Sequence, residues 1–77
     1  MMPKLPQFSG REVVKIFQYF GWVIARQRGS HMILVKDGHN VTLSIPDHKA
    51  VAQGTFRGLL RSAGLTAEEF VKASKQI

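Results

Sequence analysis

Three strand-like runs follow one another in the middle of this 77-residue chain, with only short turn-forming stretches between them. The runs are residues 22–27, 31–36 and 41–45. Arg28-Gly29-Ser30 forms the first predicted turn, and Asp37-Gly38, a strong hairpin signal, lies in the second. Strands joined so closely pair in opposite directions, because parallel pairing needs a long crossover connection. The pattern therefore predicts a three-stranded antiparallel sheet.

The third run shows that this sheet has one buried and one open side. Its residues alternate strictly, with Val41, Leu43 and Ile45 on one side and Asn40, Thr42 and Ser44 on the other. This is the pattern of a half-buried strand, and we expect Pro46 to end it because proline cannot donate a ladder hydrogen bond. One face of the sheet should therefore be covered, and the other left to solvent or to a partner.

A helix is predicted before the strands. Ser9-Gly10-Arg11-Glu12 reads as a capping box, in which the Ser9 hydroxyl accepts from the Glu12 amide and the Glu12 carboxylate reaches back. Gly21 follows at the position where many helices end in a residue of positive φ. The apolar face of this helix consists of Val13, Ile16, Phe17 and Phe20.

Two further helices are predicted after the strands. The first runs from Gly54 to Gly64, with an apolar face of Phe56, Leu59, Leu60 and Ala63. Thr66-Ala67-Glu68-Glu69 is a second capping box, which opens a short terminal helix that turns Phe70 and Val71 inward. The order α-β-β-β-α-α predicts an α+β fold with the topology of double-stranded-RNA-binding domains plus one C-terminal helix. We predict a single domain over residues 1–77, in which residues 1–8 form an irregular arm.

The composition limits the chemistry that this fold can carry. The chain has no cysteine, which excludes disulfides, cysteine zinc sites and iron–sulfur clusters, and which suits a reducing cytoplasm, the expected location. The longest apolar run, Met32 to Val35, is far shorter than the ~20 residues of a membrane span. A net charge of +6 favours a polyanionic partner such as nucleic acid. An acidic protein partner, or solubility alone, would explain this charge equally well.

Three histidines are the only side chains of types that ordinarily titrate near neutral pH. Their spacing is too irregular for a zinc motif, so we predict no metal site. His31 is the candidate catalytic residue, because it begins a strand beside a tight turn and stands among Arg26, Arg28 and Lys36. An imidazole could take the proton of a ribose 2′-hydroxyl, while the cations stabilise charge that builds on the phosphoryl oxygens. Spacing alone nevertheless favours a strand-end histidine that only hydrogen-bonds the turn.

Other polar residues are weaker candidates. His39 stands in a turn, where an exposed polar residue is expected. His48, two residues after Pro46, could be a second acid–base group, a phosphate contact or an ordinary loop residue. Arg57 and Arg61 share one side of a helix and could bind phosphates, but such a stripe is often only a solvated surface.

Six short motifs, in a fixed order, resemble those of a known family. They are Gly21-Trp22, Gly29-Ser30-His31, Pro46-Asp47-His48, Gly54-Thr55-Phe56, Arg61-Ser62-Ala63-Gly64-Leu65 and Glu68-Glu69-Phe70. Each motif is weak alone, but their order and spacing resemble the HicA toxins, a family of messenger-RNA interferases, from about Ser9 to Phe70. Phe56 departs slightly from the family pattern, which more often has an aliphatic residue there.

The resemblance implies a function and a set of partners. It implies a double-stranded-RNA-binding-like toxin that cleaves messenger RNA and is held in check by a HicB-like antitoxin on its active face. It also implies that the essential histidine follows the Gly-Ser pair, which makes it His31. Cleavage should need no metal and no small-molecule cofactor, because a 2′-hydroxyl nucleophile requires neither. The predicted RNA contacts are Arg26, Arg28, Ser30, Lys36, Arg57 and Arg61, with His48 as a candidate second acid–base or phosphate group.

Two other functions remain open at the level of sequence. The fold and charge fit a non-catalytic RNA-binding module, which would bind RNA in a salt-dependent way without forming product. They also fit a small basic subunit of a protein complex. His31 discriminates between these functions, because only the endoribonuclease needs its imidazole.

Overall fold

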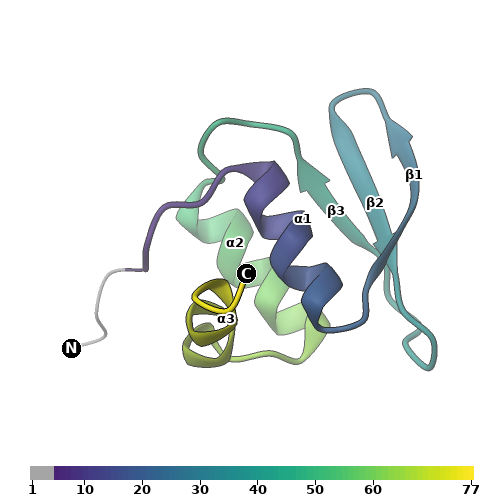
Figure 1. Cartoon of the computed structure of the whole chain (residues 1–77). Helices are drawn as coiled ribbons and strands as arrows, with labels where there is room; N and C mark the ends of the chain where they lie inside the picture. Colours follow the sequence, from purple (N-terminus) through teal and green to yellow (C-terminus); the bar gives the residue numbers. More distant parts are fainter. Residues whose placement is uncertain (1–4) are drawn as a thin grey trace.

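The computed structural model describes residues 5–77 as a three-stranded antiparallel sheet with three helices on one side (Figure 1). The elements are α1 (Gly10–Tyr19), β1 (Val23–Arg28), β2 (His31–Val35), β3 (Leu43–Pro46), α2 (Gln53–Ala63) and α3 (Ala67–Ser74). The strands lie in the order β1-β2-β3, and both neighbouring pairs are antiparallel. The predicted element order and the antiparallel meander are therefore confirmed.

Capping boxes begin the first and the last helix, as the sequence predicts. At α1 the Ser9 Oγ accepts from the Glu12 N–H at 3.1 Å, and the Glu12 Oε1 accepts from the Ser9 N–H at 2.8 Å. Thr66 and Glu69 make the same pair of bonds at α3, at 3.0 and 2.9 Å. The backbone N–H of the capping residue is the largest cause of the lowered pKa of Glu12 and of Glu69, and the hydroxyl of the same residue is the second, because both groups favour the charged carboxylate.

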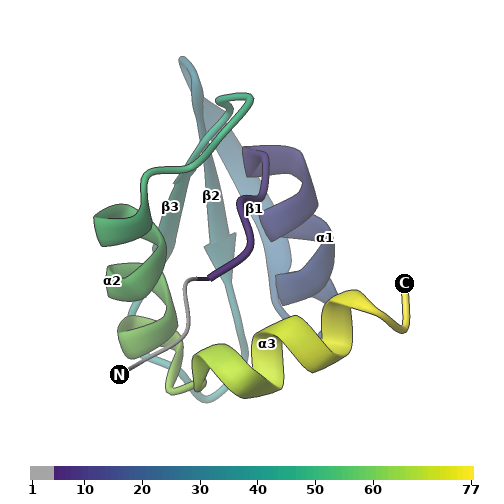
Figure 2. The same ribbon diagram turned by 90° about the vertical axis from the view of Figure 1, so that its left-hand side faces the viewer.

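The core fills the space between the helices and one side of the sheet. Its largest side chains, each at most 2% exposed, are Trp22, Phe17, Phe56 and Phe70. Phe70 of α3 meets Phe17 of α1 and Phe56 of α2 edge to face, with ring centroids 5.0 and 4.9 Å apart. Figure 2 shows α3 running from the end of α2 across to α1. The terminal helix therefore closes the core that the other two helices leave open.

The described part of the N-terminal arm, residues 5–8, is irregular but packed. The Phe8 ring lies 5.7 Å from that of Phe56 and 5.6 Å from that of Phe70, centroid to centroid. The Phe8 carbonyl accepts from the Val51 N–H at 2.8 Å. The rest of the predicted arm, residues 1–4, lies outside the described residues.

The third strand is shorter than the sequence predicts. Val41 was expected on the core side, but β3 begins at Leu43, and Val41 is 43% exposed. The reason is the register: Leu43 pairs with Leu34, so Val41 would pair with Lys36, which lies beyond the end of β2. The first strand also begins one residue late, since the Trp22 N–H donates to the Phe17 carbonyl at 3.1 Å instead of to a neighbouring strand.

Candidate functional site

The strand register assigns each residue of the sheet to one of its two sides. In β2, Met32 and Leu34 are buried toward the helices, so His31, Ile33 and Val35 project from the opposite side. Directly paired residues of neighbouring strands share a side. We call the side turned away from the helices the open face. It consists of Val23, Arg26 and Arg28 of β1, His31, Ile33 and Val35 of β2, and Ser44 and Pro46 of β3, of which Pro46 is buried.

A β-bulge places both arginines of β1 on the open face. Val23 and Ile24 pair with Val35 and Leu34, and a strand continuing that register would put Arg26 opposite Met32, on the helix side. The register instead shifts by one residue between Ile24 and Arg26. Arg26 therefore pairs with Ile33 and Arg28 pairs with His31. Bulges commonly re-aim side chains in this way next to active sites.

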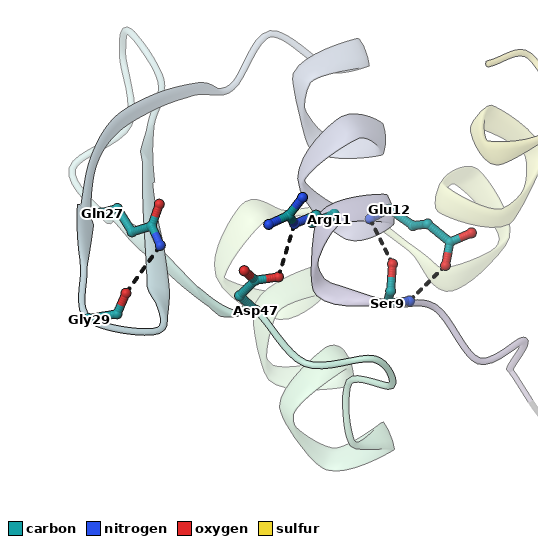
Figure 3. Close-up of polar contacts among 6 residues, drawn as sticks. All are labelled: Ser9, Arg11, Glu12, Gln27, Gly29 and Asp47. Atoms are coloured by element: carbon teal, nitrogen blue, oxygen red, sulfur yellow. Dashed lines mark hydrogen bonds and ion pairs between the residues drawn. The ribbon is translucent and has the colours of Figure 1, made fainter.

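His31 lies at the end of the sheet where β1 turns into β2. Its neighbours are Arg28 on β1 and Pro46 on β3, and its side chain is exposed. Gly29 holds the turn with a φ of 58°, a left-handed conformation that glycine adopts without strain. The Gln27 Nε2 donates to the Gly29 carbonyl at 3.1 Å across this turn (Figure 3). The imidazole thus projects from a defined position beside a cationic neighbour.

The loop after β3 is fixed against this turn. The Asp47 N–H donates to the Ser30 carbonyl at 2.7 Å, and the Asp47 Oδ1 accepts from the Arg11 Nε at 3.3 Å (Figure 3). The His48 carbonyl accepts from the Gly10 N–H at 2.9 Å. The β1–β2 turn, the end of β3 and the start of α1 accordingly lie at the same end of the molecule (Figure 1).

Gly10 allows the helix to approach this loop closely. A Cβ atom at this position would lie 1.9 Å from the Pro46 carbonyl oxygen, far inside van der Waals contact. Only glycine therefore fits between the first turn of α1 and the last residue of β3. The same contact brings Arg11 within reach of Asp47.

Four predicted site residues gather at the turn end of the open face. Arg26, Arg28 and His31 project from it, and Ser30 lies in the adjoining turn. His48 belongs to the loop at the same end, and its side chain is exposed. The structure therefore brings the candidate catalytic residue together with half of the predicted RNA contacts.

The remaining predicted RNA contacts lie elsewhere. Lys36 follows the far end of β2, about 17 Å from His31 at the usual rise per strand residue, and its side chain lies beside Gly21. Arg57 and Arg61 belong to α2, which packs in the helix layer and not on the open face. His39 packs its ring edge-on against Trp22 at 5.2 Å, which gives it a structural role.

Sequence reasoning missed the contribution of Arg11 and Asp47. Arg11 was only the third residue of a capping box, and Asp47 the middle of a short motif. Their ion pair joins residues 36 positions apart in the chain. A contact of that range depends on how α1 packs against β3, which no local pattern reveals.

Two kinds of feature are absent from the described residues, 5–77. No group of three or more His, Asp or Glu side chains in this range could hold a metal ion. None of the helices formed by these residues is long and apolar enough to cross a membrane.

Comparison with known proteins identifies the family. The profile of the HicA toxin of bacterial toxin–antitoxin systems matches residues 10–65, which include every residue of the candidate site. The chain belongs to the HicA toxin family. Among solved structures, a chain of a toxin–antitoxin complex from Streptococcus pneumoniae is 32% identical, with a TM-score of 0.67. The match covers 75% of this HicA chain and 98% of the pneumococcal one, whereas no curated protein sequence matches.

Proposed function

We propose that this HicA toxin is an endoribonuclease that cleaves messenger RNA on the open face of its sheet, with His31 as general base. The observation that carries the proposal is the pairing of His31 with Arg28, two exposed residues next to the β1–β2 turn. An imidazole beside a guanidinium can move a proton while the guanidinium binds the phosphate. The family membership supports the role of toxin.

The reaction is an attack within the RNA itself. His31 accepts the proton of a ribose 2′-hydroxyl, and the resulting oxygen forms a bond to the adjacent phosphorus. The bond from phosphorus to the 5′-oxygen breaks, and that oxygen takes up a proton. The products are a 2′,3′-cyclic phosphate and a 5′-hydroxyl. Arg28, together with Arg26 two residues earlier on the same face, stabilises the negative charge on the phosphoryl oxygens during this step.

The proton for the leaving oxygen has two candidate sources in this site. His48 lies in the loop fixed to Gly10, at the same end of the sheet as His31. His31 itself could return the proton it has accepted. A bell-shaped dependence of the rate on pH that loses one limb in His48→Ala would assign the donor to His48.

The proposed partner is a HicB-like antitoxin that covers the open face. The pneumococcal relative comes from a toxin–antitoxin complex, which supports a protein partner for this chain as well. The open face combines Arg26 and Arg28 with Val23, whose side chain is 55% exposed. A partner that places acidic and apolar groups there would neutralise the cations and exclude RNA. Such a toxin would act on messenger RNA in the cytoplasm.

Incubation with matched RNA and DNA oligonucleotides tests the mechanism. In excess chelator, the purified protein should cleave the RNA to fragments ending in a cyclic phosphate and leave the DNA intact, because DNA has no 2′-hydroxyl. Loss of cleavage in chelator, or equal cleavage of the DNA, would contradict the proposed reaction. RNA that is bound in a salt-dependent way but never cleaved would identify a non-catalytic binding module instead.

A further inference from the structure

We infer that Arg11 is a further RNA-binding residue, which holds a phosphate on the β3 side of His31 as Arg28 does on the β1 side. This inference rests on the proposed function. The loop after β3 lies beside His31. His31 pairs with Pro46, and the next residue, Asp47, donates its N–H to the Ser30 carbonyl just before His31. The Asp47 carboxylate in turn binds Arg11. Two short contacts therefore connect the Arg11 guanidinium to the backbone that carries His31.

The Arg11 side chain is arranged to bind something besides Asp47. It is 81% exposed, and its contact with Asp47 uses Nε alone. Within residues 5–77 its terminal Nη groups make no hydrogen bond, and these are the groups that bind phosphate oxygens in pairs. An exposed ion pair of this kind stabilises a fold very little. Its effect is to fix the direction in which the guanidinium points.

Asp47 also limits how RNA can approach. Its negative charge lies on the Nε side of Arg11, at 3.3 Å, and would repel a phosphate there. A phosphate must therefore meet the opposite side of the guanidinium, where the Nη groups are. The cations near His31 come from β1, on the open face, and from the start of α1, in the helix layer where α1 packs against β3. The RNA strand would then pass around the turn end of the sheet from Arg28 toward Arg11, with the scissile phosphate at His31.

The salt dependence of RNA binding tests the inference without relying on cleavage. The parent is His31→Ala, which should bind a single-stranded RNA without cutting it. In this background Arg11→Gln should weaken binding roughly three- to tenfold near 0.1 M salt. It should also reduce the slope of log K against log salt by about 0.7, the value for one phosphate contact on a single strand. Arg11→Lys should retain most of the slope, because it keeps the charge.

Lys72→Gln is the matched control, since Lys72 is an exposed cation of α3 in the helix layer. It removes the same charge and should leave the slope unchanged. A slope for Arg11→Gln equal to that of the parent overturns the inference. A lower melting temperature with an unchanged slope also overturns it, and shows a structural ion pair only. If wild type cleaves RNA while the slope does not respond, only Arg11 is excluded. If the parent binds no RNA and wild type cleaves none, the proposed function fails as well.

Discussion

The two sides of the sheet differ in what covers them. On the helix side, the side chains of Met32, Leu34, Leu43 and Ile45 are at most 8% exposed. On the open face, the arginines and His31 are all exposed. Burying such groups without partners would cost several kcal/mol each, on the order of a small domain's total stability. Stability is therefore carried on one side, which leaves the other side free to carry charged and titratable groups.

The helices also cover the three strands unequally, β3 most and β1 least. Helices α1 and α2 pack against β3, whereas every residue of β1 is exposed, including Ile24 on its helix side. Figure 1 shows β1 at the edge of the sheet that lies away from α2. β1, the strand that carries Arg26 and Arg28, thus contributes least to the core. Its side chains can change with little effect on folding.

Truncation of a core aromatic should produce the largest loss of stability. Phe70 is fully buried and contacts three other aromatic rings, so Phe70→Ala should lower the free energy of unfolding by about 3–5 kcal/mol. Val23→Ala, on the open face, should change it by less than about 0.5 kcal/mol. Urea denaturation followed by circular dichroism measures both. Equal losses for the two variants would mean that the sides do not differ as described.

A substitution where α1 meets β3 should affect both sides of the sheet. Gly10→Ala places a methyl group against the Pro46 carbonyl, and we expect a loss of about 1–3 kcal/mol in the free energy of unfolding. It should also slow RNA cleavage, because Pro46 and Asp47 lie beside His31. In Gly58→Ala, the added Cβ meets no atom within 4 Å, and this α2 variant should be slightly more stable. A Gly10→Ala protein with the wild-type stability and cleavage rate would contradict the close approach of α1 to β3.

Neutralising an arginine of the open face should weaken RNA binding much more than neutralising an arginine of the helix layer. Arg28→Gln should weaken RNA binding about tenfold at low salt with little change in stability, because Arg28 is next to His31 on the open face. Arg61→Gln, in the helix layer, should weaken it far less. Binding of a fluorescent RNA measures both affinities. A larger effect of Arg61→Gln would place the RNA on the helix layer instead.

The pH dependence of folding should reflect the two helix caps. The caps lower the pKa of Glu12 and Glu69 below 4.5 in the folded state. A carboxylate with a depressed folded pKa contributes stability above its unfolded pKa, and this contribution disappears as the pH falls through the folded value. The free energy of unfolding should therefore decrease slightly below about pH 4.5. The double variant Glu12→Gln with Glu69→Gln should show a smaller decrease in acid denaturation followed by circular dichroism, and an equal decrease would contradict the role of the caps.

Local patterns in the sequence predicted most of the fold. Both capping boxes, the apolar faces of α1 and α2, and the turn at Gly29 depend on residues within one or two turns of each other. The predictions were wrong where the position of a residue depends on its partner in the neighbouring strand. Val41 fits the alternation of β3 but has no partner, because β2 has already ended. The bulge beside Arg26 is likewise a property of two strands together.

The candidate site was predicted in part for the same reason. His31 and the two arginines of β1 lie within six residues of one another in the chain, so their clustering was visible. Lys36 appeared equally close, but a strand carries it to the far end of the sheet. Arg11 and Asp47 come from distant segments that meet only through the packing of Gly10 against Pro46.

The most direct test of the account compares RNA cleavage by wild type and by His31→Ala. Because the His31 side chain is exposed on the open face, the variant should unfold at nearly the wild-type urea concentration. Its rate of RNA cleavage should fall by about 10²–10⁴-fold, the usual contribution of a general acid–base group. A folded His31→Ala protein that cleaves RNA at the wild-type rate would contradict the assignment of the open face as the active site.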